Sequence, residues 1–195
     1  MKGILAKKIG MTRIIDQETG KVLPVTLLMV EDNDVLQVKT ADKDGYEAVV
    51  LGSFPRKKFG KNTNRKYKMI KELPLSEGEE YKKGDVLKLD ALEGVKRVKI
   101  TGISKGRGFS GVIKRWNFRR GRETHGSHHH REPGSVGMCA KPGRILKGKK
   151  LPGHYGNEQV TLVTEIIEID LDNNVFAVKG PVPGAKNGYL FIREY

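Results

Sequence analysis

Short hydrophobic runs separated by turn residues cover both ends of this 195-residue chain. Gly45, Gly84 and Gly94 separate several of these runs, and tight turns use the positive backbone angles that glycine tolerates. Many short strands at this spacing predict a mainly β protein, closed as a barrel or packed as a sandwich. The predicted strands cover residues 21–30, 34–40, 46–51, 85–89, 95–103, 159–169, 175–178 and 189–193.

The centre of the chain lacks this pattern. Residues 102–156 hold 12 glycines and only 14 apolar residues among 55 positions. Too little apolar surface is available there to offset the conformational entropy lost on ordering. Because predicted strands flank the segment on both sides, the sequence predicts a β-barrel domain of residues 1–101 and 157–195, interrupted by an arm of residues 102–156. We expect a binding partner to order the arm, since its aromatic residues are unusual for a plain linker.

Positive charge is concentrated in two segments. Residues 102–156 contribute +11 and residues 56–71 contribute +8 to a net charge of +14, so the remainder is mildly acidic at −5. A basic footprint confined in this way predicts binding to a polyanion. Arginine forks match phosphate geometry, and glycines let the backbone approach a partner closely, which favours folded RNA. Residues 57–71 are predicted to form a loop or a short basic helix whose cations contact phosphates.

Other features limit the protein class and compartment. No apolar stretch approaches the roughly 18 residues that a membrane-spanning helix needs, and the N-terminus lacks the apolar core of a signal peptide. The lone Cys139 excludes an internal disulfide and indicates a reducing compartment, with the cytosol as the default. We interpret Cys139 as a small buried residue.

Two glycine-rich motifs imitate nucleotide sites. Residues 106–111 match G-x-G-x-x-G, but the dinucleotide fold also needs a following helix and a second apolar strand, and the sequence after this motif predicts neither. Residues 143–149 match most of a phosphate-binding loop, but Lys150 stands where Ser or Thr must bind magnesium. The sequence therefore predicts no cofactor and no small-molecule substrate.

Four histidines near Cys139 leave a metal site open as an alternative. Three of them are consecutive, whereas structural zinc usually takes spaced pairs of ligands. We favour imidazoles that stack on bases or bond to phosphate and ribose. A metal-dependent hydrolase is the rival from another class, and a freestanding RNA chaperone or translation factor is a third reading. Trp116 is expected either in a core, stacked on RNA, or packed at the base of the arm.

Long strings in this chain resemble the L3 family of large-subunit ribosomal proteins. They are KGRGFSGVIKRW (105–116), HGS (125–127), HREPGSVG (130–137), PGR (142–144), KGKKLPGH (147–154) and GNEQVT (156–161), with KKIGMTR (7–13) and KGPVPGA (179–185) near the ends. The resemblance spans nearly the whole chain in the correct order. Two departures stand out: residues 56–71 are shorter than in many bacterial relatives, and His154 replaces a glutamine that some members methylate.

This resemblance implies a structural protein rather than an enzyme. It implies a translation-factor type of β-barrel on the subunit surface and an arm that enters the rRNA core toward the peptidyl-transferase centre. It further implies direct binding to 23S rRNA near its 3′ end, a role early in subunit assembly, and neighbouring proteins L14 and L19. A bacterial ribosome in the cytoplasm, with no membrane partner, is the expected setting.

The predicted rRNA contacts come from both basic segments. Glycines expected to allow close backbone approach are Gly106, Gly108, Gly111, Gly126, Gly134 and Gly153. Side chains expected to bind rRNA are Arg56, Lys57, Lys58, Lys61, Arg65, Lys105, Arg107, Lys114, Arg115, Trp116, Arg119, Arg120, Arg122, His125, His128, His129, His130, Arg131, Lys141, Arg144, Lys147, Lys149, Lys150 and His154.

Overall fold

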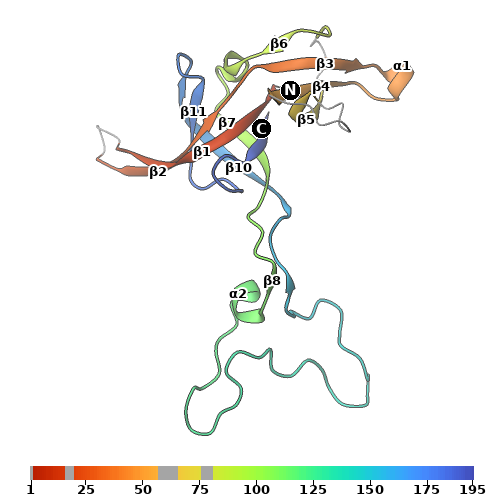
Figure 1. Cartoon of the computed structure of the whole chain (residues 1–195), viewed down its shortest axis with the longest axis vertical. Helices are drawn as coiled ribbons and strands as arrows, with labels where there is room; N and C mark the ends of the chain where they lie inside the picture. Colours follow the sequence, from red (N-terminus) through yellow and green to blue (C-terminus); the bar gives the residue numbers. More distant parts are fainter. Residues whose placement is uncertain (1, 16–19, 57–65, 76–80) are drawn as a thin grey trace. The chain divides into compact units, whose positions relative to one another are not determined.

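The computed structural model describes residues 2–15, 20–56, 66–75 and 81–195. The chain is mainly β, which confirms the predicted fold class, and it groups into two compact units (Figure 1). The first unit, here called the body, comprises Met1–Ser104 and Gln159–Tyr195; the second, here called the arm, comprises Lys105–Glu158. Across the residues described, no helix has the length and hydrophobicity to cross a membrane.

Six antiparallel strands of the body close into a barrel, because each pairs with two neighbours around the ring. Ile100 of β7, Leu28 of β2 and Phe176 of β11 fill its core, and Leu89 and Leu92 of a 3₁₀ turn, Leu89–Leu92, pack against them. In ring order the strands are β1 (Gly3–Ile15), β12 (Tyr189–Glu194), β7 (Arg97–Ile103), β10 (Gln159–Asp170), β11 (Val175–Lys179) and β2 (Val22–Met29).

Strand β1 was not among the predicted strands, because both of its faces are buried and it lacks alternation. Ile4 and Ala6 enter the barrel core, whereas Leu5 enters a second apolar cluster with Val49 and Leu73. Lys8, which interrupts the apolar run, is also buried and donates from Nζ to the carbonyl of Val182 at 2.6 Å. A strand buried on both faces is hard to recognise from a period of two.

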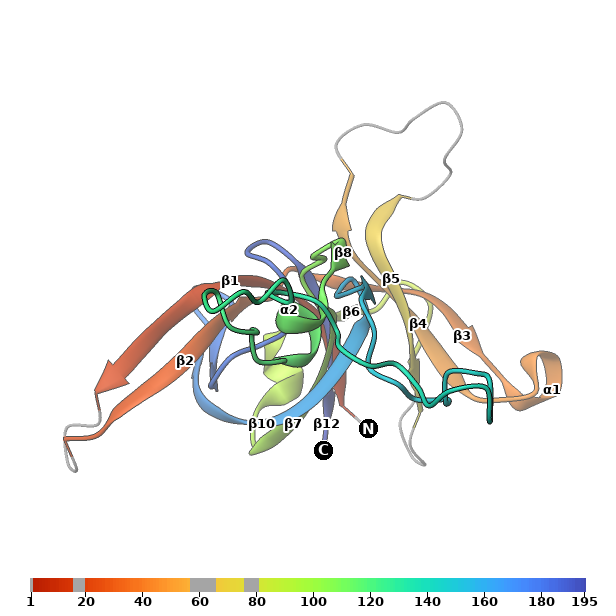
Figure 2. The ribbon, with the colours of Figure 1, turned by 90° about the horizontal axis from the view of Figure 1, so that it is seen from below.

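A second sheet of four strands packs on that apolar cluster (Figure 2). Its order is β5 (Tyr67–Pro74), β4 (Ala48–Pro55), β3 (Asn33–Lys39) and β6 (Val86–Leu87), and the helix α1 (Ala41–Asp44) lies between β3 and β4. Two sequence predictions are wrong here. Residues 67–71 form a strand rather than a loop or helix, and only Val86 and Leu87 of the segment 85–89 are in a strand.

The segment between β7 and β10 begins and ends at adjacent positions of the barrel. Ile103, the last residue of β7, pairs with Gln159, the first residue of β10. The arm therefore interrupts a β-hairpin, and both of its ends are fixed by the same strand pair.

Candidate nucleic-acid interface

The base of the arm is a narrow antiparallel ladder. The backbone nitrogen of Arg107 donates to the carbonyl of Tyr155 at 2.8 Å, and the nitrogen of Tyr155 donates to the carbonyl of Gly108 at 3.0 Å. The ladder continues as β8 (Phe109–Ser110) and β9 (Gly153–His154). These bonds satisfy backbone groups that have no larger sheet to join.

A five-residue helix, α2 (Val112–Trp116), follows β8. The expectation that no helix follows the glycine motif at 106–111 is therefore wrong. The motif still lacks the parallel second strand of a dinucleotide fold, since β8 pairs antiparallel with β9. Val112 is buried, and Asn117 ends the helix in the left-handed conformation with φ 58°.

Trp116 joins the outgoing and returning halves of the arm. Its Nε1 donates to the carbonyl oxygen of Leu151 at 2.9 Å, and Nη1 of Arg115 donates to the same oxygen at 3.1 Å. The guanidinium of Arg115 and the ammonium of Lys150 lie 5.0 and 5.7 Å from the indole. The tryptophan thus packs at the arm's base and is not a core residue, while 38% of its surface remains exposed. The sequence offered no reason to single out Leu151, which acts through its backbone.

Two glycines that the sequence did not single out hold the backbone at close approaches. At Gly156, φ is 75° and a Cβ would lie 2.1 Å from the carbonyl oxygen of Lys105. A Cβ at Gly121 would lie 1.6 Å from the carbonyl oxygen of His129. Only glycine fits either position without movement of the neighbouring backbone.

The six glycines predicted to allow close approach lie in different settings. A Cβ at Gly153 would lie 2.5 Å from Nη1 of Arg115, and one at Gly106 would lie 3.4 Å from Cβ of Asn157. Gly111 has open space around it. The other three adopt positive φ in turns: Gly108, Gly126 and Gly134.

The distal arm, residues 117–152, has no helix or strand and is largely exposed. Cys139 is exposed, so its predicted burial is wrong. The physical reason is that no packed layer covers the turns around it, where Met138, Ile145 and Leu146 are 67%, 48% and 50% exposed.

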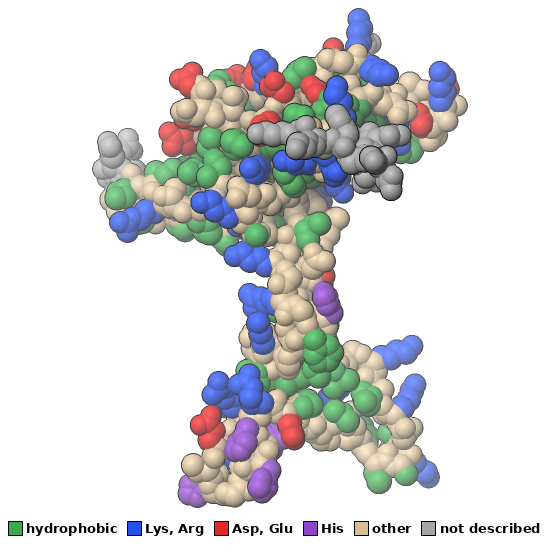
Figure 3. Space-filling view, in the orientation of Figure 1, with side chains coloured by type: hydrophobic (Ala, Val, Ile, Leu, Met, Phe, Trp, Pro, Cys, Tyr) green, Lys and Arg blue, Asp and Glu red, His purple; other side chains and the backbone are tan. Residues whose placement is uncertain are grey.

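Cations project from the whole length of the arm (Figure 3). One is half-buried, Arg115, and one forms an ion pair, Arg120 with Glu123 at 3.3 Å. Arg107 lies over the ring of Tyr155 at 5.2 Å. The remaining predicted contacts are exposed and have no ion pair within the described chain: Lys105, Lys114, Arg119, Arg122, Arg131, Lys141, Arg144, Lys147 and Lys149.

The histidines gather in one loop of the arm and are all exposed (Figure 3). Nδ1 of His130 lies 2.8 Å from the carbonyl oxygen of Arg122, and His129 lies 3.4 Å from Glu132. His128 and His125 face solvent, the latter in a turn with φ 59°. Within the described part of the chain, no three His, Cys, Asp or Glu side chains lie close enough to hold a metal ion.

An exposed aromatic residue near the base of the arm was missing from the predicted contacts. Phe109 is 80% exposed and pairs in the ladder with His154, which is also exposed. Two ring systems on adjacent strands offer a surface on which bases can stack. An aromatic residue among glycines and arginines, as in GRGFSG, is the sequence pattern that points to it.

The second basic segment is only partly described. Lys57, Lys58, Lys61 and Arg65 lie outside the described residues. Arg56 is half-buried at the end of β4, and its backbone nitrogen donates to the carbonyl of Lys66 at 3.0 Å. The exposed Lys68 and Lys71 belong to β5.

Comparison with known proteins gives one consistent result. The model of the family described as Ribosomal protein L3 matches residues 83–174. A relative from Thermosipho africanus, named large ribosomal subunit protein uL3, is 46% identical over 99% of this chain and 98% of the relative. Proteins of the same name from Persephonella marina and Oceanobacillus iheyensis are each 43% identical, over 99% and 98% of this chain and 89% and 96% of the relatives.

Proposed function

Because this chain belongs to the ribosomal protein L3 family, a family of structural components and not enzymes, we propose that its arm is an rRNA clamp of the large ribosomal subunit. The single observation that supports the clamp most strongly is the row of exposed, unpaired cations on residues 105–150. A backbone with so little packing of its own gains order when a polyanion pairs with those charges.

The base of the arm supplies a fixed start for this clamp. The backbone ladder and the Trp116–Leu151 hydrogen bond hold its two halves together. Beyond them, arginines offer paired donors to phosphates, and Phe109 and His154 offer stacking surfaces. Phosphate contacts position a protein on RNA, while stacking and base contacts select the site.

Within the subunit, the proposal is that the body lies at the surface, that the chain binds 23S rRNA near its 3′ end, and that the arm extends toward the peptidyl-transferase centre. Early participation in assembly and neighbours of the L14 and L19 types belong to the same proposal. Its support is the family membership together with the basic arm, and its setting is the cytoplasm of a bacterium.

Co-sedimentation tests the proposal directly. The tagged protein is expressed in bacteria, and large subunits are sedimented after a wash in high salt. We expect the full-length chain to remain with the subunit, and a chain lacking residues 119–143 to be depleted. Release of the full-length chain by the wash would instead favour a freestanding RNA chaperone or translation factor.

A further inference from the structure

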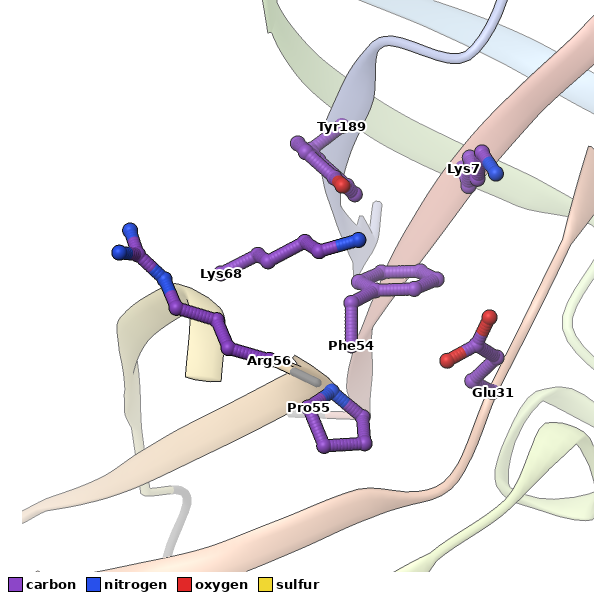
Figure 4. Close-up of a pocket in the computed structure, with 7 residues that line it drawn as sticks. All are labelled: Lys7, Glu31, Phe54, Pro55, Arg56, Lys68 and Tyr189. Carbon is purple, nitrogen blue, oxygen red and sulfur yellow. The ribbon is translucent and has the colours of Figure 1, made fainter. Parts of the chain in front are cut away.

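A hollow of about 820 Å³ opens on the body where the barrel meets the second sheet (Figure 4). Lys7 of β1 and Tyr189 of β12 line it from the barrel. The second sheet contributes Phe54 and Pro55 of β4, Arg56 directly after them and Lys68 of β5; Glu31, directly after β2 and Val30, completes the lining. Its volume falls in the range of roughly 300–1,000 Å³ that is typical of small-molecule pockets.

The wall of this hollow contains a backbone outlier. Phe54 has φ 61°, a left-handed conformation that costs a bulky residue about 1–2 kcal/mol. It lies between the pairs Ser53–Met69 and Pro55–Tyr67, so it faces Lys68 across the ladder. Such outliers persist where the surrounding structure enforces them, and they gather at functional sites.

The outlier places two aromatic rings together. The ring of Phe54 is 3% exposed and packs on the half-buried ring of Tyr189, with centroids 4.9 Å apart and planes tilted by 46°. Phe54 therefore supports Tyr189 from behind, and Tyr189 presents the accessible aromatic surface. A planar base can stack on such a supported ring with little loss of side-chain entropy.

Charges around the rings are mostly positive. Lys7, Arg56 and Lys68 stand against one carboxylate, Glu31, and none of the three cations forms an ion pair with a described residue. Figure 4 shows the ammonium of Lys68 directed between the two rings, with the carboxylate of Glu31 on the other side of the hollow. Unpaired cations attract a phosphate, and a carboxylate accepts hydrogen bonds from the amino group of a base.

We propose that this hollow binds one unpaired nucleotide of RNA. The base stacks on Tyr189, its amino group donates to Glu31, and its phosphate pairs with Lys7 and Lys68. Adenine, cytosine and guanine carry an exocyclic amino group and uracil does not, so uridine is disfavoured. This proposal deepens the rRNA-binding function proposed above, but it concerns the body and is independent of the arm.

Fluorine NMR of the full-length protein, labelled with 3-fluorotyrosine, tests the proposal. The chain has six tyrosines, and Tyr189→Phe and Tyr155→Phe assign the resonances of the hollow and of the arm. Titration with the tetranucleotide AAAA is expected to shift the Tyr189 resonance, and UUUU is expected to bind there at least fivefold more weakly. Lys7→Gln with Lys68→Gln should raise the dissociation constant read at Tyr189 at least fivefold, whereas the control Lys43→Gln with Lys83→Gln should leave it within twofold.

The Tyr155 resonance separates the two proposals. A response at Tyr155 without one at Tyr189 overturns the nucleotide pocket and leaves the clamp standing. No response at either tyrosine contradicts both. If the double variant fails to fold, the wild-type comparison of AAAA with UUUU decides alone, and equal affinities overturn the role of Glu31 and the proposal with it. In assembled subunits, ultraviolet cross-linking should join Tyr189 to a nucleotide; a cross-link to a protein segment instead overturns the proposal.

Discussion

The indole nitrogen of Trp116 and the backbone carbonyl of Leu151 are 2.9 Å apart, and this hydrogen bond spans 35 residues of sequence. It lies just beyond the ladder that starts at Arg107 and Tyr155. Together these contacts close the base of the arm, and past them the chain to residue 150 has no regular secondary structure. Trp116 thus marks the boundary between the part of the arm that orders itself and the part that we expect RNA to order.

Trp116→Phe keeps an aromatic ring but removes the donor to Leu151. We expect the amides of Arg107 and Tyr155 to exchange with solvent about two- to fivefold faster, equivalent to about 0.5–1 kcal/mol for one lost hydrogen bond. Hydrogen exchange on the RNA-free protein measures this, with barrel amides as the internal control. Unchanged exchange at both positions would show that the indole bond does not hold the base.

The RNA-free protein should show a gradient of protection along the arm. Amides of residues 119–150 should exchange near the rate of an unstructured chain, those of the ladder should be slower, and those of the barrel strands slowest. The reason is that the distal arm has few buried apolar contacts. Strong protection of residues 119–150 without RNA would contradict the proposal that rRNA completes the fold.

Gly156→Ala and Gly148→Ala form a matched pair at positive φ, 75° and 79°. Both pay about 1–2 kcal/mol for the left-handed backbone. Only Gly156→Ala also places a Cβ 2.1 Å from a carbonyl oxygen, whereas Gly148 has open space. We expect Gly156→Ala to reduce incorporation into large subunits much more than Gly148→Ala, with the thermal transition of the body unchanged in both. Equal incorporation would exclude a role for the close approach.

Salt dependence measures the phosphate contacts of the distal arm. Lys147→Gln with Lys149→Gln should lower the slope of log K against log salt by about 1.4–1.8, at roughly 0.7–0.9 per phosphate. Filter binding to an rRNA fragment at several salt concentrations gives the slope. The control pair Lys43→Gln with Lys83→Gln should leave it unchanged; a similar drop in the control would point to charge in general rather than to these contacts.

Alkaline pH should weaken the second sheet through Tyr67. Its hydroxyl donates a hydrogen bond to Asp34, and this bond, together with burial, raises the pKa of Tyr67 above the ordinary value near 10. Because the folded-state pKa exceeds the unfolded one, the stabilisation is fully present below about pH 10 and is lost as pH rises through the folded pKa. Urea unfolding between pH 8 and 11 should therefore show a steeper alkaline loss for wild type than for Tyr67→Phe. Parallel curves would contradict this.

Some features followed from local pattern alone. The mainly β class was predictable because alternating or continuous apolar runs reflect strands with one or two buried faces. The arm was visible as residues 102–156, where glycine and charge replace apolar residues, and its basic character requires no structure to recognise. Strand β1 escaped because Leu5 is buried on the opposite face from Ile4 and Ala6, which removes the alternation.

Other features depend on residues that are distant in sequence. That β3, β4, β5 and β6 form a separate sheet, rather than barrel strands, is decided by pairing and by the second apolar cluster. Likewise, Leu151 acts through a carbonyl, Gly156 through the space beside it, and Phe54 through its backbone angle. Composition and periodicity report how much apolar and charged surface a segment carries. Which backbone groups and rings meet is fixed only when the chain closes on itself, so only the tertiary structure decided the base of the arm and the hollow on the body.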